Sequence, residues 1–153
     1  AAGLTHGAFP AHFSSKEELA LESLKRILAA SLEKIDRASL TSESRNAFFE
    51  NYLSKKHRDN AGTGCPMVAL STEINRKNGD IQKVFTTYFS DLIDKLANRF
   101  FNRRRNPREE AIATISMIVG ALTLARAVSD KNLSNEILLS VRSHIGVNSH
   151  TKK

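Results

Sequence analysis

The sequence contains little of what several classes of protein require. Its single cysteine, Cys65, has no partner for an internal disulfide, and we find neither a leader-like segment nor a run of about 18 or more apolar residues. Alternating runs of β-branched residues are missing, as are internal repeats and low-complexity blocks. These absences predict an all-α protein in the reducing cytoplasm, without a membrane partner.

Motifs for catalysis or cofactor binding are missing as well. There is no glycine-rich dinucleotide fingerprint and no phosphate-cradling loop, and the five histidines are too scattered for a metal site. We therefore expect no enzyme activity, no cofactor and no metal. The alternative is a helical enzyme with Cys65 as its nucleophile, which would require rapid alkylation of Cys65 coupled to turnover.

Positive charge is what the sequence does contain. It has 23 lysines and arginines against 16 aspartates and glutamates, a net charge of +7. Clustered cations gain affinity for phosphates by releasing counterions, so nucleic acid is the first candidate partner. For the densest basic run we favour a solvated turn between helices over a nucleic-acid contact. This run consists of Arg99, Arg103, Arg104, Arg105 and Arg108.

Helical periodicity extends through the chain. Residues 4–13 predict a short helix at most, because Thr5 can cap it and Pro10 removes a backbone donor. Ser15 and Glu18 form a capping box that opens a long amphipathic helix over residues 16–37.

Start and stop signals divide the rest of the chain. Capping side chains or a proline at the first helical position mark starts at Pro66, Asp80, Asn106 with Pro107, and Ser134. Gly79 and Gly146 mark helix ends. Together with the periodicity, these signals predict helices over residues 42–56, 66–78, 80–102, 107–129 and 135–145, a loop over 59–64 and a disordered tail over 148–153.

Aromatic and other large side chains on these helices are candidates for lining an apolar cavity, the usual ligand site in a helical bundle. They are Phe48, Phe49, Tyr52, Met67, Phe85, Tyr88, Phe89, Met117 and Leu122. The alternative for each residue is a plain hydrophobic core. Cys65 precedes a helix whose dipole stabilises a thiolate, so it is a candidate sensor of oxidants or electrophiles, with a buried unreactive cysteine as the alternative.

The first nineteen residues carry a family resemblance. AAGLTHGAF over 1–9, His12-Phe13 and SKEEL over 15–19 closely resemble the end of a TetR-family helix-turn-helix. GCPMVAL over 64–70 and VGALTLARAV over 119–128 resemble the sensor domain of one subgroup. The resemblance implies a TetR-like fold, with the end of the DNA-binding head and a connecting helix over 1–37 and a ligand-sensing and dimerisation bundle over 38–147.

The same resemblance implies roles in DNA binding. Thr5, His6 and Gly7 would meet base edges, and His12 and Lys16 would contact the DNA backbone. We expect the first helix of the head to be absent from this chain. Pro10 stands where the family usually has tyrosine, so we expect the chain as written to bind DNA poorly.

The function implied is a ligand-responsive repressor that binds operator DNA as a homodimer if its head is complete. A small, mostly apolar effector in the sensor core would release the DNA. The dimer would form through the last two long helices, at Ile112, Ile115, Val119, Leu122, Ile137 and Val141. The alternative is a dimeric ligand-sensing or electrophile-sensing protein that no longer binds DNA.

Overall fold

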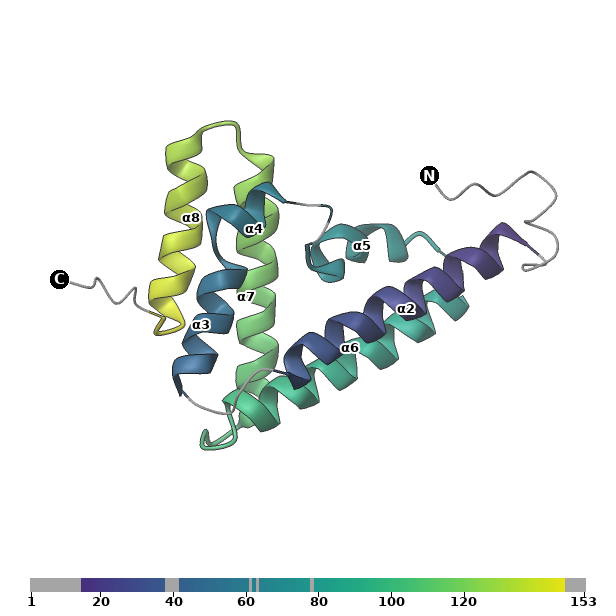
Figure 1. Ribbon diagram of the computed structural model, residues 1–153, viewed down its shortest axis with the longest axis horizontal. Helices are drawn as coiled ribbons and strands as arrows, with labels where there is room; N and C mark the ends of the chain where they lie inside the picture. Colours follow the sequence, from purple (N-terminus) through teal and green to yellow (C-terminus); the bar gives the residue numbers. More distant parts are fainter. Residues whose placement is uncertain (1–14, 38–41, 61, 63, 78, 148–153) are drawn as a thin grey trace.

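The computed structural model describes residues 15–37, 42–60, 62, 64–77 and 79–147, and the regular structure in these residues is helical, as predicted. The helices are α2 (Lys16–Asp36), α3 (Ser42–Tyr52), α4 (Lys55–Asp59), α5 (Pro66–Ile74), α6 (Gly79–Phe100), α7 (Pro107–Ala127) and α8 (Lys131–His144). Figure 1 shows α7 and α8 as an antiparallel hairpin, with the long helices α2 and α6 projecting from its base.

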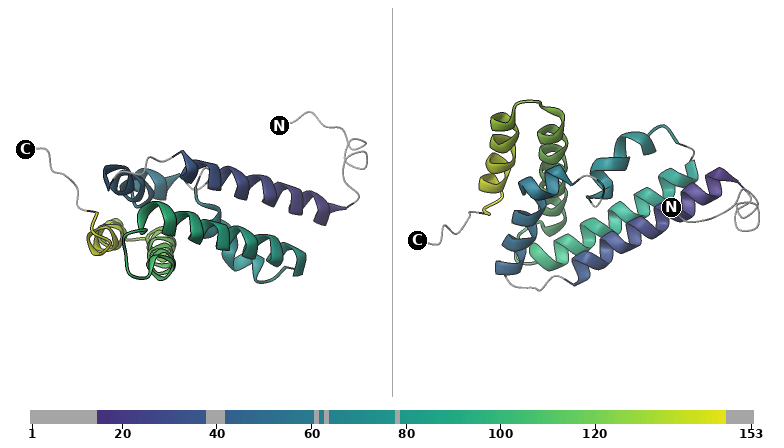
Figure 2. Two further views of the ribbon diagram at one scale, coloured as in Figure 1. Left: turned by 90° about the horizontal axis from the view of Figure 1, so that it is seen from below. Right: turned by 45° about the horizontal axis from the view of Figure 1, so that its top comes forward.

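Helices α2 and α6 run side by side in the same direction, which the views in Figure 2 also show. The Ser31 hydroxyl lies 3.1 Å from that of Tyr88, and further along the pair Lys95 binds Asp36 at 2.8 Å. The predicted cap of α2 is confirmed, because the Ser15 side chain accepts a hydrogen bond from the Glu18 amide at 3.1 Å.

Helix α7 is the central helix of the bundle. It begins at Pro107, as predicted from proline at the first helical position. By length and composition it is apolar enough to cross a membrane. One face nevertheless packs into the core, as expected for the central helix of a bundle. That face carries Ala111, Thr114, Ile115, Ile118, Ala121, Leu122 and Ala125.

The prediction of a single helix over residues 42–56 is wrong, because the helix is interrupted between α3 and α4. Ser54 caps the new helix: its hydroxyl accepts a hydrogen bond from the His57 amide at 3.1 Å and donates to the Asn51 carbonyl at 2.7 Å. Because the Ser54 hydroxyl hydrogen-bonds a carbonyl at the end of α3 and an amide at the start of α4, it favours ending one helix and starting another over a continuous helix. This interruption places His57 and Arg58 on the separate helix α4.

The predicted start of the last helix at residue 135 is also wrong. Helix α8 begins at Lys131, where the Asp130 side chain accepts a hydrogen bond from the Asn132 amide at 2.7 Å. Ser134, predicted as the cap, is buried and donates to the Ala125 carbonyl of α7 at 2.6 Å. Gly146 does end the helix as predicted, with a φ of 72° that favours glycine.

Gly79 was predicted to end a helix and instead begins one. Helix α5 stops at Ile74, and Gly79 is the first residue of α6. Residue 78, the predicted last helical residue, lies outside the described residues.

Candidate ligand-binding site

A cavity of about 730 Å³ opens between α2, α3, α4, α6, α7 and the start of α5. This volume falls in the range of roughly 300–1,000 Å³ that is typical of small-molecule sites. The cavity is lined by Ile27, Ala30, Ser31, Lys34, Ile35, Phe48, Asn51, Tyr52, Lys56, His57, Asn60, Gly62, Gly64, Cys65, Pro66, Tyr88, Leu92, Leu96, Ile115 and Ile118.

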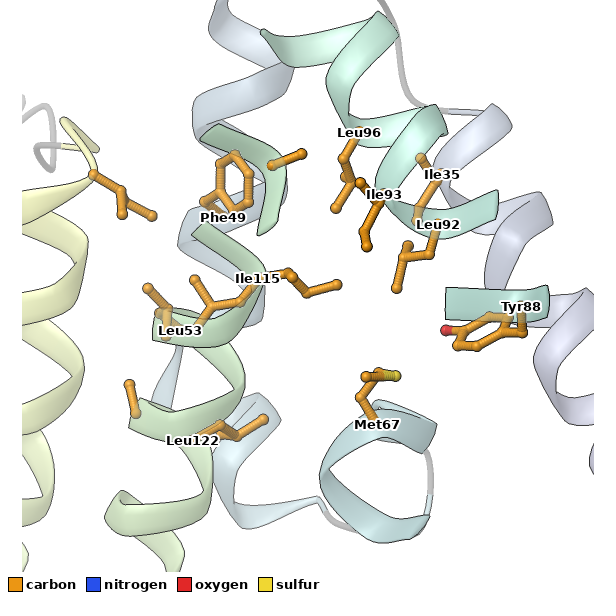
Figure 3. Packing of buried hydrophobic residues seen from close by; sticks show 14 of the residues in the cluster. Ile35, Phe49, Leu53, Met67, Tyr88, Leu92, Ile93, Leu96, Ile115 and Leu122 are labelled. Atoms are coloured by element: carbon orange, nitrogen blue, oxygen red, sulfur yellow. The ribbon is translucent and has the colours of Figure 1, made fainter. Parts of the chain in front are cut away.

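The floor of the cavity is apolar and buried. Leu92 and Leu96 on α6, Ile115 and Ile118 on α7, and Ile35 on α2 are each at most 4% exposed. Figure 3 shows Tyr88 and Leu92 of α6 directed toward the region between α5 and α7. Such a floor favours an apolar ligand, since burying apolar surface contributes about 25 cal/mol per Å².

Hydroxyl groups interrupt the apolar wall where α2 meets α6. The hydroxyls of Ser31 and Tyr88 lie 3.1 Å apart, and either can be the donor. Burial raises the pKa of Tyr88 to about 12. Its hydroxyl therefore stays protonated across the physiological range.

On the opposite wall, α3 and α4 are joined through His57. The His57 ring donates from Nδ1 to the Tyr52 carbonyl at 2.7 Å, and the two rings make an edge contact with centroids 4.8 Å apart. This contact fixes the imidazole at the wall of the cavity, since a tethered Nδ1 sets the orientation of the ring.

The Tyr52 hydroxyl is buried; among the described residues it has no oxygen or nitrogen partner, and the weakly hydrogen-bonding Cys65 thiol lies beside it. Burial first, and then the nearby Cys65 thiol, raise the pKa of Tyr52 far above its usual range. Cys65 is half-buried at the N-cap position of α5 and makes no capping hydrogen bond there. The wall thus holds a protonated donor beside a free thiol.

The structure brings together part of the predicted pocket set. Phe48, Tyr52 and Tyr88 line the cavity, as does Cys65. Phe49, Met67 and Leu122 are buried in the core, with at most 6% exposure. The three remaining residues are partly buried against that core, and they are Phe85, Phe89 and Met117.

Sequence reasoning missed the polar part of the lining. Ser31 and Lys34 belong to α2, and Lys56 and His57 belong to the short helix α4. Polar residues on an amphipathic helix predict a solvated face. The capping serine at position 54 was the one local signal that these α4 residues turn toward a new neighbour.

Two arginines connect the cavity wall to the α7–α8 hairpin. Arg126 of α7 donates to the carbonyls of His57 and Arg58, each at 2.9 Å. Arg58, only 7% exposed, donates to the Ser134 hydroxyl at 2.8 Å and to Asn135 at 2.9 Å. Buried hydrogen bonds to charged groups are costly to break, so α4 is held firmly on the hairpin.

The residues predicted for the dimer interface divide into two groups. Ile115 and Leu122 are at most 4% exposed within one chain, so they cannot form an outer surface. Val119, Ile137 and Val141 are partly buried, and Ile112 is 40% exposed. The hairpin also exposes three leucines that were not predicted for the interface and that are at least 43% exposed. They are Leu124, Leu133 and Leu139.

Most of the predicted DNA-binding residues lie outside the described residues, namely Thr5, His6, Gly7 and His12. Lys16 is exposed at the start of α2. The arginine run lies around the turn from α6 to α7, at the opposite end of α2 from Lys16 (Figure 1). Within that run, Arg108 pairs with Asp94.

An all-helical bundle with a ligand-sized cavity beside a helical hairpin is typical of the sensor domain of a transcriptional regulator. Residues 41–138 match the family described as transcriptional regulator LmrA/YxaF-like, C-terminal domain. The chain therefore belongs to the TetR family of transcriptional regulators, as its sequence indicated.

A solved structure of E. coli NemR in its reduced form has the same architecture. Its TM-score is 0.76 at 23% sequence identity, and the match covers 94% of this chain and 79% of that chain. At this identity the likeness shows the fold. A search of curated proteins finds no match.

Proposed function

We propose that the protein is a ligand-responsive, DNA-binding repressor that works in the cytoplasm. One observation carries this proposal: the wall of the cavity includes α2, the helix that leads back to residues 1–14. By resemblance, those residues hold the operator contacts Thr5, His6, Gly7 and His12. A ligand in the cavity therefore adjoins the helix that connects to the head.

The effector is a small, mostly apolar molecule. It releases DNA by binding one position of α2 better than another, because a ligand shifts an equilibrium only by its differential affinity. In this proposal, residues 1–37 are head and connecting helix, 38–147 sense the ligand and dimerise, and 148–153 are a tail.

Two copies pair through the outer face of the α7–α8 hairpin to form a four-helix interface. The exposed side chains of Ile112, Leu124, Leu133 and Leu139 on these two helices support this, since exposed apolar surface is typical of an interaction site. A two-fold dimer presents its heads to half-sites about 34–36 Å apart.

A gel shift with the full-length protein and the DNA upstream of its own gene tests this function. We expect a retarded band from one dimer per operator, weakened by rising salt as phosphate contacts require. Adding a ligand that fills the cavity should release the DNA. A full-length protein that leaves every upstream fragment unretarded would contradict the repressor function.

A second candidate is a dimeric ligand or electrophile sensor that does not bind DNA. It is favoured by the position of Cys65, which lines the cavity next to the Tyr52 hydroxyl. Treatment with iodoacetamide, in which the thiolate sulfur bonds to carbon and iodide leaves, would label Cys65. Labelling without any operator binding favours the sensor, whereas labelling that releases the operator favours the repressor. Cys65→Ser is the control.

A further inference from the structure

The charged groups that line the cavity carry one sign. Lys34 of α2 and Lys56 of α4 are both exposed and lie at its mouth, and the described lining residues include no aspartate or glutamate. None of the ion pairs among the described residues involves either lysine. Within the described part of the chain, the mouth therefore presents two lysines that form no ion pair with a carboxylate.

Below the lysines, the wall offers a hydrogen-bond donor. The buried Tyr52 hydroxyl has no oxygen or nitrogen partner among the described residues, only the weakly hydrogen-bonding Cys65 thiol beside it, and it keeps its proton because its pKa is raised. A buried hydroxyl with only a sulfur neighbour is poorly satisfied, and an oxygen acceptor on a ligand would satisfy it better. An anionic acceptor makes a stronger hydrogen bond than a neutral one.

We infer that the cavity selects an amphipathic anion, an apolar ring or chain that carries one acidic group such as a carboxylate or sulfonate. The apolar part lies on the floor formed by Leu92, Leu96 and Ile118. The acidic group lies toward Lys34 and Lys56, at the edge of a low-dielectric cavity where opposite charges attract more strongly than in water. This inference rests on the proposed effector role of the cavity and narrows the class of effector.

Three ligands with one ring system and different charge test it: 2-naphthoate, 2-naphthalenemethanol and 2-naphthylmethylammonium. Their dissociation constants are measured with the full chain by isothermal titration calorimetry at neutral pH. We expect the carboxylate to bind about tenfold more tightly than the alcohol, equivalent to about 1.4 kcal/mol. The ammonium ligand should bind most weakly.

Matched double variants locate the effect. Lys34→Met with Lys56→Met should remove the preference for the carboxylate and leave the affinity for the alcohol unchanged. Lys25→Met with Lys55→Met is the control, because these lysines lie on the same two helices but do not line the cavity. The control should keep the full preference although it loses the same net charge.

Several results would overturn the inference: equal affinity for the three ligands, no binding of any, or a preference that survives in the Lys34/Lys56 variant. Loss of the preference in the Lys25/Lys55 control would overturn it too, since net charge would then be the cause. The gel shift tests the repressor function independently of these affinity measurements. A protein that prefers the carboxylate but never retards DNA keeps the selectivity and loses the repressor function.

Discussion

The two sides of the cavity are attached to the bundle by different interactions. On the α4 side, the buried guanidinium of Arg58 reaches Ser134 and Asn135 of α8, and Arg126 holds two α4 carbonyls. On the α2 side, the polar links to α6 include the Ser31–Tyr88 hydroxyl pair and bonds from Lys95 and Arg99 to Asp36 near the surface.

This difference indicates which wall yields to a ligand. Partly exposed ion pairs contribute little to stability, whereas buried hydrogen bonds to charged groups contribute more. From these polar contacts we expect the α4 wall to move with the α7–α8 hairpin, and α2 to move more readily against both. We call the α4 side the firm wall and the α2 side the yielding wall, and this contrast can be tested by substitution.

Leu122→Ala should have the largest effect on stability. The side chain of Leu122 is fully buried on α7, so its truncation leaves a cavity in the firm part of the bundle. We expect a loss of about 2–5 kcal/mol in the free energy of unfolding, measured in urea. Ile27→Ala on α2, where the side chain is 51% exposed, is the control and should cost far less. Similar losses from both variants would contradict the difference in burial between these two positions.

Arg58→Met should cost about 2 kcal/mol, because its hydrogen bonds to the Ser134 and Asn135 side chains are lost. Hydrogen exchange should rise in α4 and at the start of α8 and remain unchanged in α2. Arg103→Met, at an exposed position, is the control. Faster exchange confined to α2 would show that Arg58 does not hold α4 on the hairpin.

The raised pKa of Tyr88, which contacts Ser31 of α2, predicts that the free energy of unfolding depends on pH. Burial raises the folded pKa of Tyr88 to about 12, above the ordinary tyrosine value of 10.0, so its contribution is complete below pH 10 and is lost as the pH rises through about 12. Between pH 9 and pH 11, Tyr88 should account for about 1 kcal/mol of lost stability. In Tyr88→Phe the loss over this interval should be smaller by that amount; an unchanged slope would contradict the assignment.

Lys95→Met should have the smallest global effect, within about 1 kcal/mol, because its ion pair with Asp36 is partly exposed. Locally, it should speed hydrogen exchange at the C-terminal end of α2, with α8 unaffected. Lys83→Met, in an exposed pair within α6, is the control. Faster exchange in α8 would mean that the two walls are not independent.

The fold was predictable where the deciding interaction is local. Ser15 and Pro107 mark helix starts through groups within one turn, and both starts are confirmed. The errors arose where two local signals compete. Asp130 begins α8 one turn ahead of Ser134, whose hydroxyl instead bonds across to α7, and a single sequence does not rank such competitors.

The cavity was less predictable than the helices. Aromatic side chains suggested its position, yet Phe49 is fully buried in the core while aliphatic and polar residues form much of the lining. Which side of a helix faces a cavity depends on how helices distant in the sequence cross. The arrangement of Lys34 with Lys56 depends on the break at Ser54, which periodicity alone does not reveal.

Helix α2 has the geometry of a lever. Its C-terminal end is tied at Asp36, which Lys95 and Arg99 both bind, and it lines the cavity from Ile27 to Ile35. At 1.5 Å per residue, Ile27 lies about 14 Å from that pivot and Lys16 about 30 Å from it. A rigid rotation that moves the helix by about 1 Å at Ile27 therefore moves Lys16 by about 2 Å. A displacement of α2 at the cavity is therefore amplified at Lys16.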